Sequence, residues 1–589
     1  MVIQQDRSLL LNTKTMKKLL LLSLILLSFK GFSQFVNPLT IPPALTGTTF
    51  NLNVQNGTTQ FWNGITTPTF GVNGNILAPT LIVNKWDSVT INVTNSLTGS
   101  GNSTTMHWHG LHVPAKYDGG PHQVILQGTT WSPKFRILNN AGTYWYHPHG
   151  DNQTDRQVSK GIAGMIIVKD SAEANINLPR TYGVDDFPLV VQTKAFDVLN
   201  QIAISTAEDT LVVVNGTAHP YLDAPAQVIR LRLLNGSSIR SFNFGFNGNF
   251  PFRIIATDGG LIDSARTFTR ILLNPGERVE IIVDLQNQQG NTLYLNSYSN
   301  ELPNGIYGAA TVTSMMGGII TDYNLNPLNG SVVGILKLNV IAPTSNPILT
   351  TPSSLVAQTP ITNYTVSRTF LLQPDTMMNA QQQVEGPFNI NGTHFNMNVI
   401  NVTTYLNNVE KWRIQNNTGI AHPFHIHDVQ FNILNINGGP VPNYQKGLKD
   451  VVLVMPMQYV EFVTKFEDYA DDMVPYMYHC HLLHHEDDGM MGSFRVIDTN
   501  SVAGINNNNI NFNVNIYPNP TSGLVKITDD SMEEKTISIM NNVGEILFCN
   551  KYYDTEVLID LKSYADGIYF IQYQSANKFM TKKLIKLKD

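Results

Sequence analysis

Residues 89–97 read Val-Thr-Ile-Asn-Val-Thr-Asn-Ser-Leu, a stretch that is typical of a β-strand running into a turn. β-branched residues alternate with polar ones, and Asn95-Ser-Leu97 ends the run. Strand-like runs also lead into Leu234-Asn-Gly236 and Gln415-Asn-Asn417. These echoes predict one β-sandwich design that is used three times along the chain.

The rest of the sequence also consists of strand-like runs separated by turns. Thr80-Leu-Ile-Val83 and Val279-Glu-Ile-Ile-Val-Asp284 are further β-branched runs, separated by Gly, Asn and Pro turns. The 43 glycines and 30 prolines fit a chain with many turns, and no long stretch has a helical period. We therefore expect an all-β fold built from sandwiches of about seven or eight strands each.

Composition shifts mark the expected domain boundaries. A Pro/Ser/Thr-rich stretch, Ala342–Pro360, and the run Asn506–Asn509 both resemble linkers. We expect sandwiches over residues 40–170, 171–345 and 360–500, and a smaller β-sandwich over residues 513–589.

Length and charge exclude several classes of protein. The chain has 589 residues, 42% of them hydrophobic, which is enough for several cores and excludes wholesale disorder. Its net charge of -6 provides no basic surplus to neutralise phosphates, so we expect no nucleic-acid partner. Two cysteines, Cys480 and Cys549, cannot form a disulfide scaffold.

The amino terminus has the pattern of a signal peptide over residues 1–33. Lys17-Lys18 precedes the apolar run Leu19–Phe29, which is too short to cross roughly 30 Å of hydrocarbon as a helix. Either Met1 or Met16 is the start. The alternative is a buried helix of the mature protein. No later stretch is long and apolar enough for a membrane span, so we expect an exported, soluble protein.

Histidines carry the strongest chemical signal. Of 15 histidines, eight form four His-X-His pairs, whereas random placement would give about 0.4 such pairs. Side chains at i and i+2 share one face of a strand, so each pair presents its imidazoles together. Imidazole binds copper, zinc and iron. The pairs therefore predict a metal cluster, and they are His107/His109, His147/His149, His425/His427 and His479/His481.

The last pair encloses a cysteine. On a strand, Cys480 points away from His479 and His481, so one segment serves two sites. His422, Cys480, His485 and Met490 supply two imidazoles, a thiolate and a thioether, which is the ligand set of a blue-copper centre. Zinc more often binds Cys and His without a thioether. Copper is therefore favoured.

The chain resembles three-domain multicopper oxidases of the bacterial laccase and copper-efflux-oxidase kind over residues of about 40–500. The resemblance rests on four motifs in this order: His107-Trp-His-Gly110, Tyr146-His-Pro-His-Gly150, His422-Pro-Phe-His-Ile-His427 and His479 to Met490. It implies three cupredoxin domains, which are Greek-key β-sandwiches. It also implies four copper ions (one type-1, one type-2 and two type-3), with the type-2 and type-3 ions between the first and third domains.

The resemblance also implies a ligand set for each copper. The type-1 ligands would be His422, Cys480, His485 and Met490. The type-2 ligands would be His107 and His425. One type-3 copper would be held by His109, His147 and His481, and the other by His149, His427 and His479.

By this resemblance the protein oxidises a small reductant one electron at a time. Electrons would pass from the type-1 copper through Cys480 to His479 and His481, and O₂ would be reduced to water with four electrons. Asp118 and Glu486 resemble the family's acidic residues that supply protons. The plain alternative is that both are solvated carboxylates, or for Asp118 a turn residue.

The substrate is less well specified. Phenols, aromatic amines and Cu(I) are the candidate reductants, and O₂ is the expected electron acceptor. Methionines are too sparse for the Met-rich insertion of many copper-efflux oxidases, which favours a laccase over a dedicated cuprous oxidase. A non-catalytic copper-sequestering surface protein is the alternative from another class. A two-domain enzyme like nitrite reductase would not need all four histidine pairs.

The carboxyl-terminal segment departs from this pattern. Asn515-Ile-Tyr-Pro-Asn-Pro520, Asp566-Gly-Ile-Tyr-Phe570 and Lys582-Lys-Leu-Ile-Lys-Leu-Lys588 resemble the sorting domain of type IX secretion substrates. The resemblance implies export through the periplasm to the cell surface or the medium, with the secretion machinery as partner. An ordinary adhesion or substrate-binding sandwich is the alternative.

Overall fold

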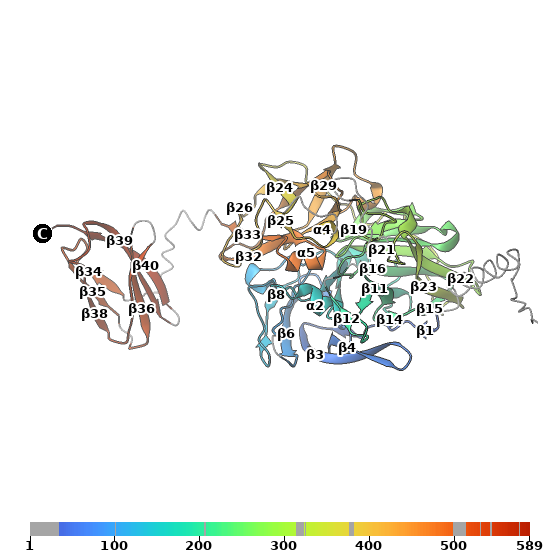
Figure 1. Cartoon of the computed structure of the whole chain (residues 1–589), viewed down its shortest axis with the longest axis horizontal. Coiled ribbons are helices and arrows are strands. Elements are labelled where there is room, and N and C mark those ends of the chain that lie inside the picture. The colour runs from blue at the N-terminus through green and yellow to red at the C-terminus, as the bar shows by residue number, and fades with distance from the viewer. Residues whose placement is uncertain are drawn as a thin grey trace, which may run out of the picture. The chain divides into compact units, whose positions relative to one another are not determined.

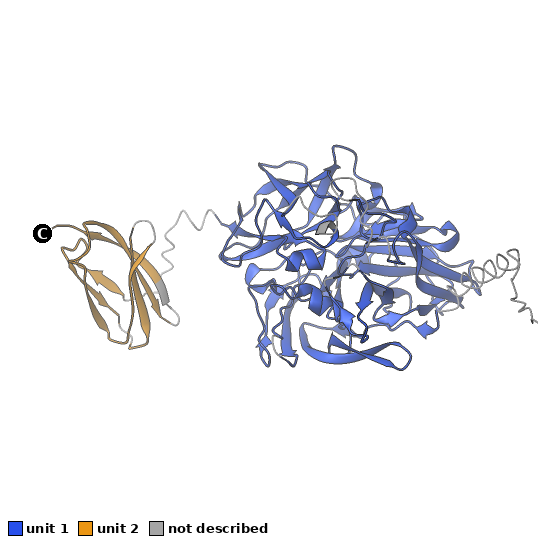
Figure 2. Ribbon diagram, in the orientation of Figure 1, with its two compact units in different colours: residues 1–498 blue, residues 499–589 orange. Residues whose placement is uncertain are grey.

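The structure is a computed structural model and divides into two compact units, residues 1–498 and 499–589 (Figure 2). It describes residues 35–99, 102–204, 206, 208–313, 323, 326–375, 382–498, 514–529, 532–541, 545–575 and 578–588. The predicted signal peptide and the run Asn506–Asn509 lie outside the described residues.

Strands dominate both units, which confirms the all-β prediction (Figure 1). The helices of the described residues are short: η1 (Ala115–Tyr117), α2 (Thr154–Ser159), α3 (Ser171–Ala174), η2 (Asn247–Asn249), η3 (Ser299–Glu301), α4 (Gln382–Glu385), η5 (Asn443–Gln445) and α5 (Leu483–Asp487). Among the residues that the structure describes, no helix has the length and apolar character needed to cross a membrane.

The first sandwich packs a sheet of order β4-β3-β6-β7, with β8 beside β6, against a sheet of order β2-β5-β10-β9. Its strands are β2 (Ala44–Thr46), β3 (Thr49–Trp62), β4 (Ile65–Val72), β5 (Thr80–Asn84), β6 (Ser88–Ser96), β7 (Thr130–Trp131), β8 (Lys134–Arg136), β9 (Gly142–Tyr146) and β10 (Gly164–Lys169). Apolar residues of both sheets, such as Leu52, Val89 and Ile166, share one buried core.

The second sandwich pairs the order β1-β15-β23-β22-β17-β20 with the order β14-β13-β11-β16-β21-β18-β19, and β12 lies beside β11. Its strands up to β16 are β1 (Asn37–Pro38), β11 (Asp186–Phe196), β12 (Ile202–Ala203), β13 (Leu211–Val214), β14 (Thr217–Ala218), β15 (Pro220–Pro225) and β16 (Val228–Asn235). The later ones are β17 (Phe242–Phe246), β18 (Phe252–Thr257), β19 (Gly260–Phe268), β20 (Ile271–Leu273), β21 (Arg278–Asp284), β22 (Thr292–Tyr298) and β23 (Val332–Ile341).

The third sandwich pairs the order β25-β24-β27-β31-β29 with the order β26-β33-β32-β28-β30. Its strands are β24 (Val366–Pro374), β25 (Phe388–Ile390), β26 (Val402–Tyr405), β27 (Val409–Asn416), β28 (His422–Ile426), β29 (Phe431–Ile436), β30 (Val451–Val454), β31 (Tyr459–Lys465), β32 (Asp471–Cys480) and β33 (Met491–Ile497). β28 and β32 are antiparallel neighbours in which His425 faces His479.

The three echoes of the sequence occupy equivalent places in the three sandwiches. Asn95, Asn235 and Asn416 each lie at or next to the end of a strand that runs parallel to the sandwich's first long strand. Each Asn is buried, donates from Nδ2 to two main-chain carbonyls and accepts from the amide two residues later. The repeated Asn therefore fixes the same turn three times.

Two segments that lie outside the second sandwich in the sequence also pack on it. β1 pairs with β15 although it precedes the first sandwich in the chain. The predicted linker over residues 342–360 runs along the same domain, where Val228 N donates to Ile348 O (2.9 Å) and Leu355 N to Asp263 O (2.9 Å). The boundaries expected between the domains stay predictions.

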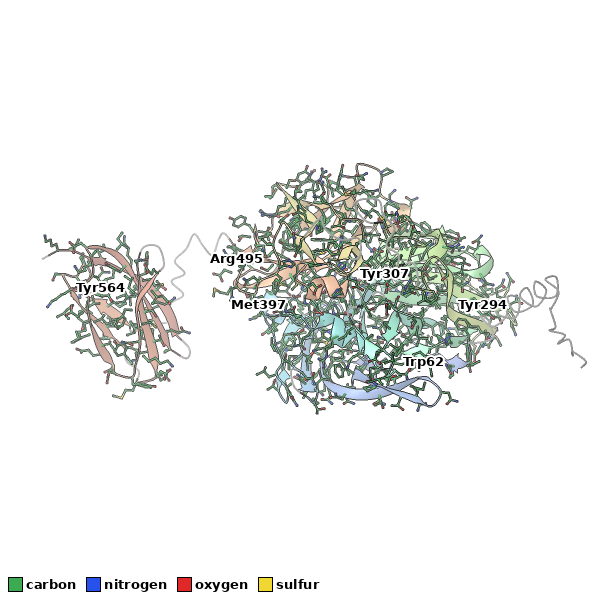
Figure 3. All side chains as sticks on the ribbon, viewed as in Figure 1. Trp62, Tyr294, Tyr307, Met397, Arg495 and Tyr564 are labelled. Atoms are coloured by element: carbon green, nitrogen blue, oxygen red, sulfur yellow. The ribbon has the colours of Figure 1, made fainter. Side chains whose placement is uncertain are left out.

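The second unit has its own core. It combines the order β34-β35-β38 with the order β37-β36-β39-β40. The strands are β34 (Asn515–Tyr517), β35 (Leu524–Thr528), β36 (Lys535–Met540), β37 (Ile546–Tyr552), β38 (Glu556–Asp560), β39 (Gly567–Ser575) and β40 (Lys578–Lys586). Val525, Ile537 and Tyr573 lie in the core, and Tyr564 packs against it (Figure 3).

Candidate metal centre

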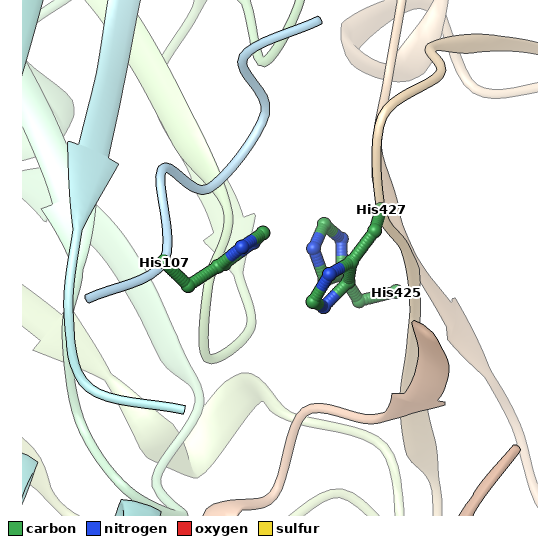
Figure 4. A group of neighbouring side chains, drawn as sticks. All are labelled: His107, His425 and His427. Carbon is green, nitrogen blue, oxygen red and sulfur yellow. The ribbon is translucent and has the colours of Figure 1, made fainter. Parts of the chain in front are cut away.

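The four histidine pairs converge inside the first unit. Two pairs come from the first sandwich and two from the third, and all eight side chains are at most 1% exposed. Figure 4 shows His107 reaching from one segment toward His425 and His427 on another. Ring nitrogens of these three residues lie within 4.8 Å of one another.

Main-chain pairing aligns the four segments that carry the histidines. His107 and His147 exchange main-chain hydrogen bonds of 2.8 and 3.1 Å, although neither lies in a long strand. On the other side, β28 and β32 place His425 opposite His479. Each sandwich thus presents two neighbouring His-X-His segments to the other.

Nitrogens that face the interior of this cluster lack ordinary hydrogen-bond partners. Among the described residues, Nε2 of His107, His147 and His425 has none. Other ring nitrogens face each other, with Nε2 of His149 and His479 3.1 Å apart and Nε2 of His427 and His479 3.3 Å apart. Buried polar atoms are almost always paired, so these lone pairs fit a set of bound cations.

Burial keeps the imidazoles neutral and able to bind a metal. Burial, with help from neighbouring imidazoles, lowers the pKa of His427 and of His481 to about 3 and that of His425 well below its usual range. Metal ligation requires the neutral ring. The site therefore suits a cation at any pH near neutrality.

The opposite ring nitrogens are held by main-chain oxygens. Nδ1 of His107 donates to Asp118 O (2.9 Å), and Nδ1 of His147 donates to Pro148 O (2.8 Å). Nδ1 of His425 donates to Asp450 O (2.8 Å). Such bonds fix the tautomer and aim Nε2 at the interior of the cluster.

The close sets of imidazoles overlap in part with the predicted ligand groups. His149, His427 and His479 form one close set, and His107 is close to His425. His109 Nδ1 lies 3.3 Å from His481 Nε2, and His109 also forms a close set with His107 and His147. The assignment of each imidazole to a particular copper stays a prediction.

A second group lies on the other face of β32. Cys480 Sγ is 3.4 Å from His422 Nδ1 and 3.7 Å from His485 Nδ1. The ring nitrogens that point away from the sulfur are fixed by hydrogen bonds. His422 Nε2 donates to Thr418 Oγ1 (2.8 Å), and His485 Nε2 donates to Val384 O (3.0 Å). Both Nδ1 atoms are therefore free to share a metal with the sulfur.

Apolar packing encloses this second group. The Phe388 ring lies 4.8 Å from the ring of His422 and 4.7 Å from that of His485, measured between centroids. Met490 is fully buried, and its carbonyl accepts from Cys480 N (3.1 Å). Burial raises the pKa of the Cys480 thiol and lowers that of His422 to about 3. A thiol in such a place ionises when a metal displaces its proton.

The two predicted proton carriers each touch imidazoles. Asp118 Oδ2 accepts from His427 Nδ1 (2.7 Å), and Glu486 Oε2 lies 3.0 Å from His479 Nδ1. Burial alone would raise the pKa of both carboxyls, but neighbouring histidines hold each well below its usual range. Neither is a solvated carboxylate, since Asp118 is 1% and Glu486 2% exposed.

Sequence reasoning missed Asp450 and Arg278. Asp450 Oδ1 accepts from His109 Nε2 (3.2 Å), and the carboxylate also receives both terminal nitrogens of Arg278. The available signal was the charged pair Lys449-Asp450 directly before the apolar run Val451–Val454. A charge at the start of a buried strand needs a partner, but the sequence does not show which one.

Five other histidines lie outside both groups, and they are His112, His122, His219, His394 and His484. His112 contacts Asp428 (2.7 Å) and Asp468 (3.1 Å), and His394 contacts Asp375 (2.5 Å). Burial lowers the pKa of His112, but the two acids outweigh it and raise the pKa to about 9.

Comparison with known proteins agrees with this geometry. Family models described as multicopper oxidase match residues 53–173, 201–314 and 365–500, and a model described as secretion system C-terminal sorting domain matches residues 515–587. The multicopper oxidase mco of Staphylococcus haemolyticus (strain JCSC1435) is 35% identical, over 76% of this chain and 88% of its own length. The cell division protein FtsP of Escherichia coli (strain K12) is 30% identical, over 78% of this chain and 92% of its own length.

Solved structures give the same result. The laccase-like multi-copper oxidase CueO from Ochrobactrum sp. superposes with a TM-score of 0.67 at 31% identity, covering 78% of this chain and all of that one. The sorting domain indicates a secreted or cell-surface protein. The chain is therefore a three-domain member of the multicopper oxidase family that carries a C-terminal sorting domain of type IX secretion.

Proposed function

We propose that the protein is a secreted oxidase that couples one-electron oxidation of small reductants to four-electron reduction of O₂ to water. One observation carries this proposal. Cys480 belongs to the second group, whereas the residues bonded to it on either side, His479 and His481, belong to the histidine cluster. The peptide bonds around Cys480 thus connect two metal sites over about three residues of strand, roughly 10 Å.

The residues present fit four copper ions. His422, Cys480, His485 and Met490 would hold a type-1 copper, and the eight paired histidines would hold the type-2 and type-3 ions. Bound copper would supply reversible one-electron chemistry and the site at which O₂ is reduced. The chain's part is to keep the rings neutral, aim them through the far nitrogen and exclude water by burial.

Proton delivery falls to the buried carboxylates in this proposal. Asp118 Oδ1 accepts no hydrogen bond of ordinary geometry among the described residues and lies 3.4 Å from His107 Nδ1, so this oxygen would carry the proton in transit while Oδ2 stays bonded to His427. Glu486 lies between His479 and His149, with Oε1 3.5 Å from His149 Nδ1. These contacts support the proposal that both acids pass protons into the cluster, from opposite sandwiches.

Phenols, aromatic amines and Cu(I) are the proposed reductants, and phenols are preferred. The Ochrobactrum relative is described as active towards lignin model compounds and lignosulfonate. The methionines of residues 315–397, Met315-Met316, Met377-Met378 and Met397, are too few for a long Met-rich insertion. A dedicated cuprous oxidase is therefore the second choice.

Oxygen uptake tests the proposal. The copper-loaded protein should turn blue and consume one O₂ for every four electrons taken from a phenol, an aromatic amine or Cu(I). Cys480→Ser should lose the blue colour and the O₂ uptake, because the sulfur that joins the two groups is gone, while the histidine cluster still binds copper. Uptake of copper without consumption of O₂ would instead identify a sequestering protein.

A further inference from the structure

The second sandwich, which holds none of the predicted ligands, reaches the histidine cluster through a buried ion pair. Arg278 is the first residue of β21, and its Nη1 and Nη2 donate to Asp450 Oδ1 and Oδ2, each at 2.6 Å. Both side chains are fully buried. Asp450 lies directly before β30, which pairs with the strand that carries His422 and His425.

Asp450 contacts two histidines of the cluster. Its carboxylate Oδ1 accepts from His109 Nε2 (3.2 Å), and its main-chain oxygen accepts from His425 Nδ1 (2.8 Å). The first bond fixes the proton of His109 on Nε2 and leaves Nδ1 as the lone pair, which faces His481 Nε2 at 3.3 Å. His107, His147 and His425 have the opposite arrangement, with Nδ1 bonded outward.

Close packing leaves no room for the Arg278–Asp450 ion pair or the ring of His481 to shift. Gly110, directly after His109, has a φ of +82°, and a Cβ there would lie 2.5 Å from Asp450 Oδ2 and 2.6 Å from Arg278 Nη2. Gly276, in the turn before β21, has a φ of +86°, and a Cβ there would lie 2.8 Å from Cδ2 of His481. The same turn therefore packs against one ring and supports the ion pair that holds another.

The arginine itself is anchored in its own sandwich. Its main-chain nitrogen donates to Asp258 Oδ1 (2.7 Å), and Nη2 also donates to the main-chain oxygen of Asp258 (3.0 Å). Lys449 joins Asp258 (2.8 Å) and Glu277 (2.6 Å) across the same boundary. The Arg278 guanidinium is bonded to Asp450 on one side and to Asp258 on the other, so its direction is fixed. The single ammonium group of a lysine would not be fixed in this way.

We propose that Arg278 and Asp450 are positioning residues, through which the second sandwich sets the ring of His109 with Nδ1 toward the copper that it shares with His147 and His481. This inference rests on the proposed function. It gives the middle domain a role in the metal centre although that domain supplies no ligand.

Arg278→Lys tests this role, because lysine keeps the charge and loses the fork. The variant should keep the full blue colour of the Cys480 site, while the dissociation constant for copper at the histidine cluster rises about 10- to 100-fold. Copper content per chain after dialysis against a graded chelator, together with electron paramagnetic resonance, measures both. Arg232→Lys is the matched control, since Arg232 is a buried arginine of the same sandwich whose fork is filled by Asp186 (2.7 and 2.8 Å).

Two results would overturn the inference: cluster copper held as tightly in Arg278→Lys as in the unsubstituted protein, or an equal loss in Arg232→Lys. If Arg278→Lys does not fold, Asp450→Asn decides. It preserves the volume and should weaken copper binding in the same direction, whereas unchanged binding would contradict the proposal. Failure of the unsubstituted protein to bind copper would refute the proposed function itself.

Discussion

At the residue scale, Asp118 joins the two halves of the cluster. Its carboxylate comes from the first sandwich and accepts from His427 of the third, while its main-chain oxygen accepts from His107. The carboxylate is thus close to imidazoles of both sandwiches but is not part of the sulfur-containing group. Its role should therefore be separable from that of Cys480.

Replacement of Asp118 by Asn should leave the blue colour intact and lower the turnover number for O₂ reduction by about 10²-fold or more, because a general acid–base group is lost. Stopped-flow absorbance and an oxygen electrode measure the two properties. Asp151→Asn, at an exposed position of the same sandwich, is the control and should change neither. Equal turnover in Asp118→Asn and the unsubstituted protein would refute the proton role.

Some residues of the candidate site could be predicted from the sequence, and others could be found only in the structure. The paired histidines and Cys480 could be predicted, because their spacing is a local property of the sequence. The expectation that each pair lies within a strand was wrong, since the pairs lie at or beyond strand ends. Asp450 and Arg278 could not, because their contact joins residues 172 positions apart in sequence. The tautomer of His109 follows from its bond to Asp450, 341 positions away in sequence, and could not be predicted either.

At the scale of the element, the turn that follows each long parallel strand depends on one buried Asn. Asn416 Nδ2 donates to Ile420 O (2.7 Å) and to Val454 O (3.0 Å), and Oδ1 accepts from Thr418 N (2.8 Å). The first carbonyl lies two residues before His422, at the start of the strand that carries the ligands.

Replacement of Asn416 by Ala should lower the free energy of unfolding of the first unit by about 2–4 kcal/mol, because buried main-chain groups lose their partners. Urea titration of the metal-free protein measures this change. Asn417→Ala, next to it and only half-buried, should cost less than about 0.5 kcal/mol. Similar losses in the two variants would contradict the assigned role of Asn416.

The echoes themselves predicted a repeated sandwich, because an Asn after a β-branched run is a local signal. They did not predict that Asn37–Pro38 would join the second sandwich, or that residues 342–360 would lie along it. Both placements depend on main-chain bonds to distant strands, which leave no pattern in the side chains.

At the scale of the whole molecule, burial of so many neutral imidazoles makes stability depend on pH. His422, His427 and His481 have a pKa of about 3 in the folded protein, against about 6.5 in an unfolded chain. The unfolded chain therefore binds more protons in acid. The stability from these residues is complete above about pH 6.5 and is lost as the pH falls toward 3.

The metal-free protein should accordingly show a urea midpoint that falls steeply between about pH 6.5 and pH 4. Copper-loaded protein should resist to lower pH, since the metal competes with the proton for the same nitrogens. Unfolding curves recorded by tryptophan fluorescence at several pH values check both statements. A midpoint of the metal-free protein that does not change over this range would contradict them.

For the whole first unit, we propose that the first and third sandwiches together hold four copper ions. X-ray diffraction from crystals of the copper-loaded protein, recorded on both sides of the copper absorption edge, tests it most directly. We predict three anomalous peaks among the eight paired histidines and one beside Cys480, between His422 and His485. Copper peaks elsewhere on the chain, or none beside Cys480, would contradict the account.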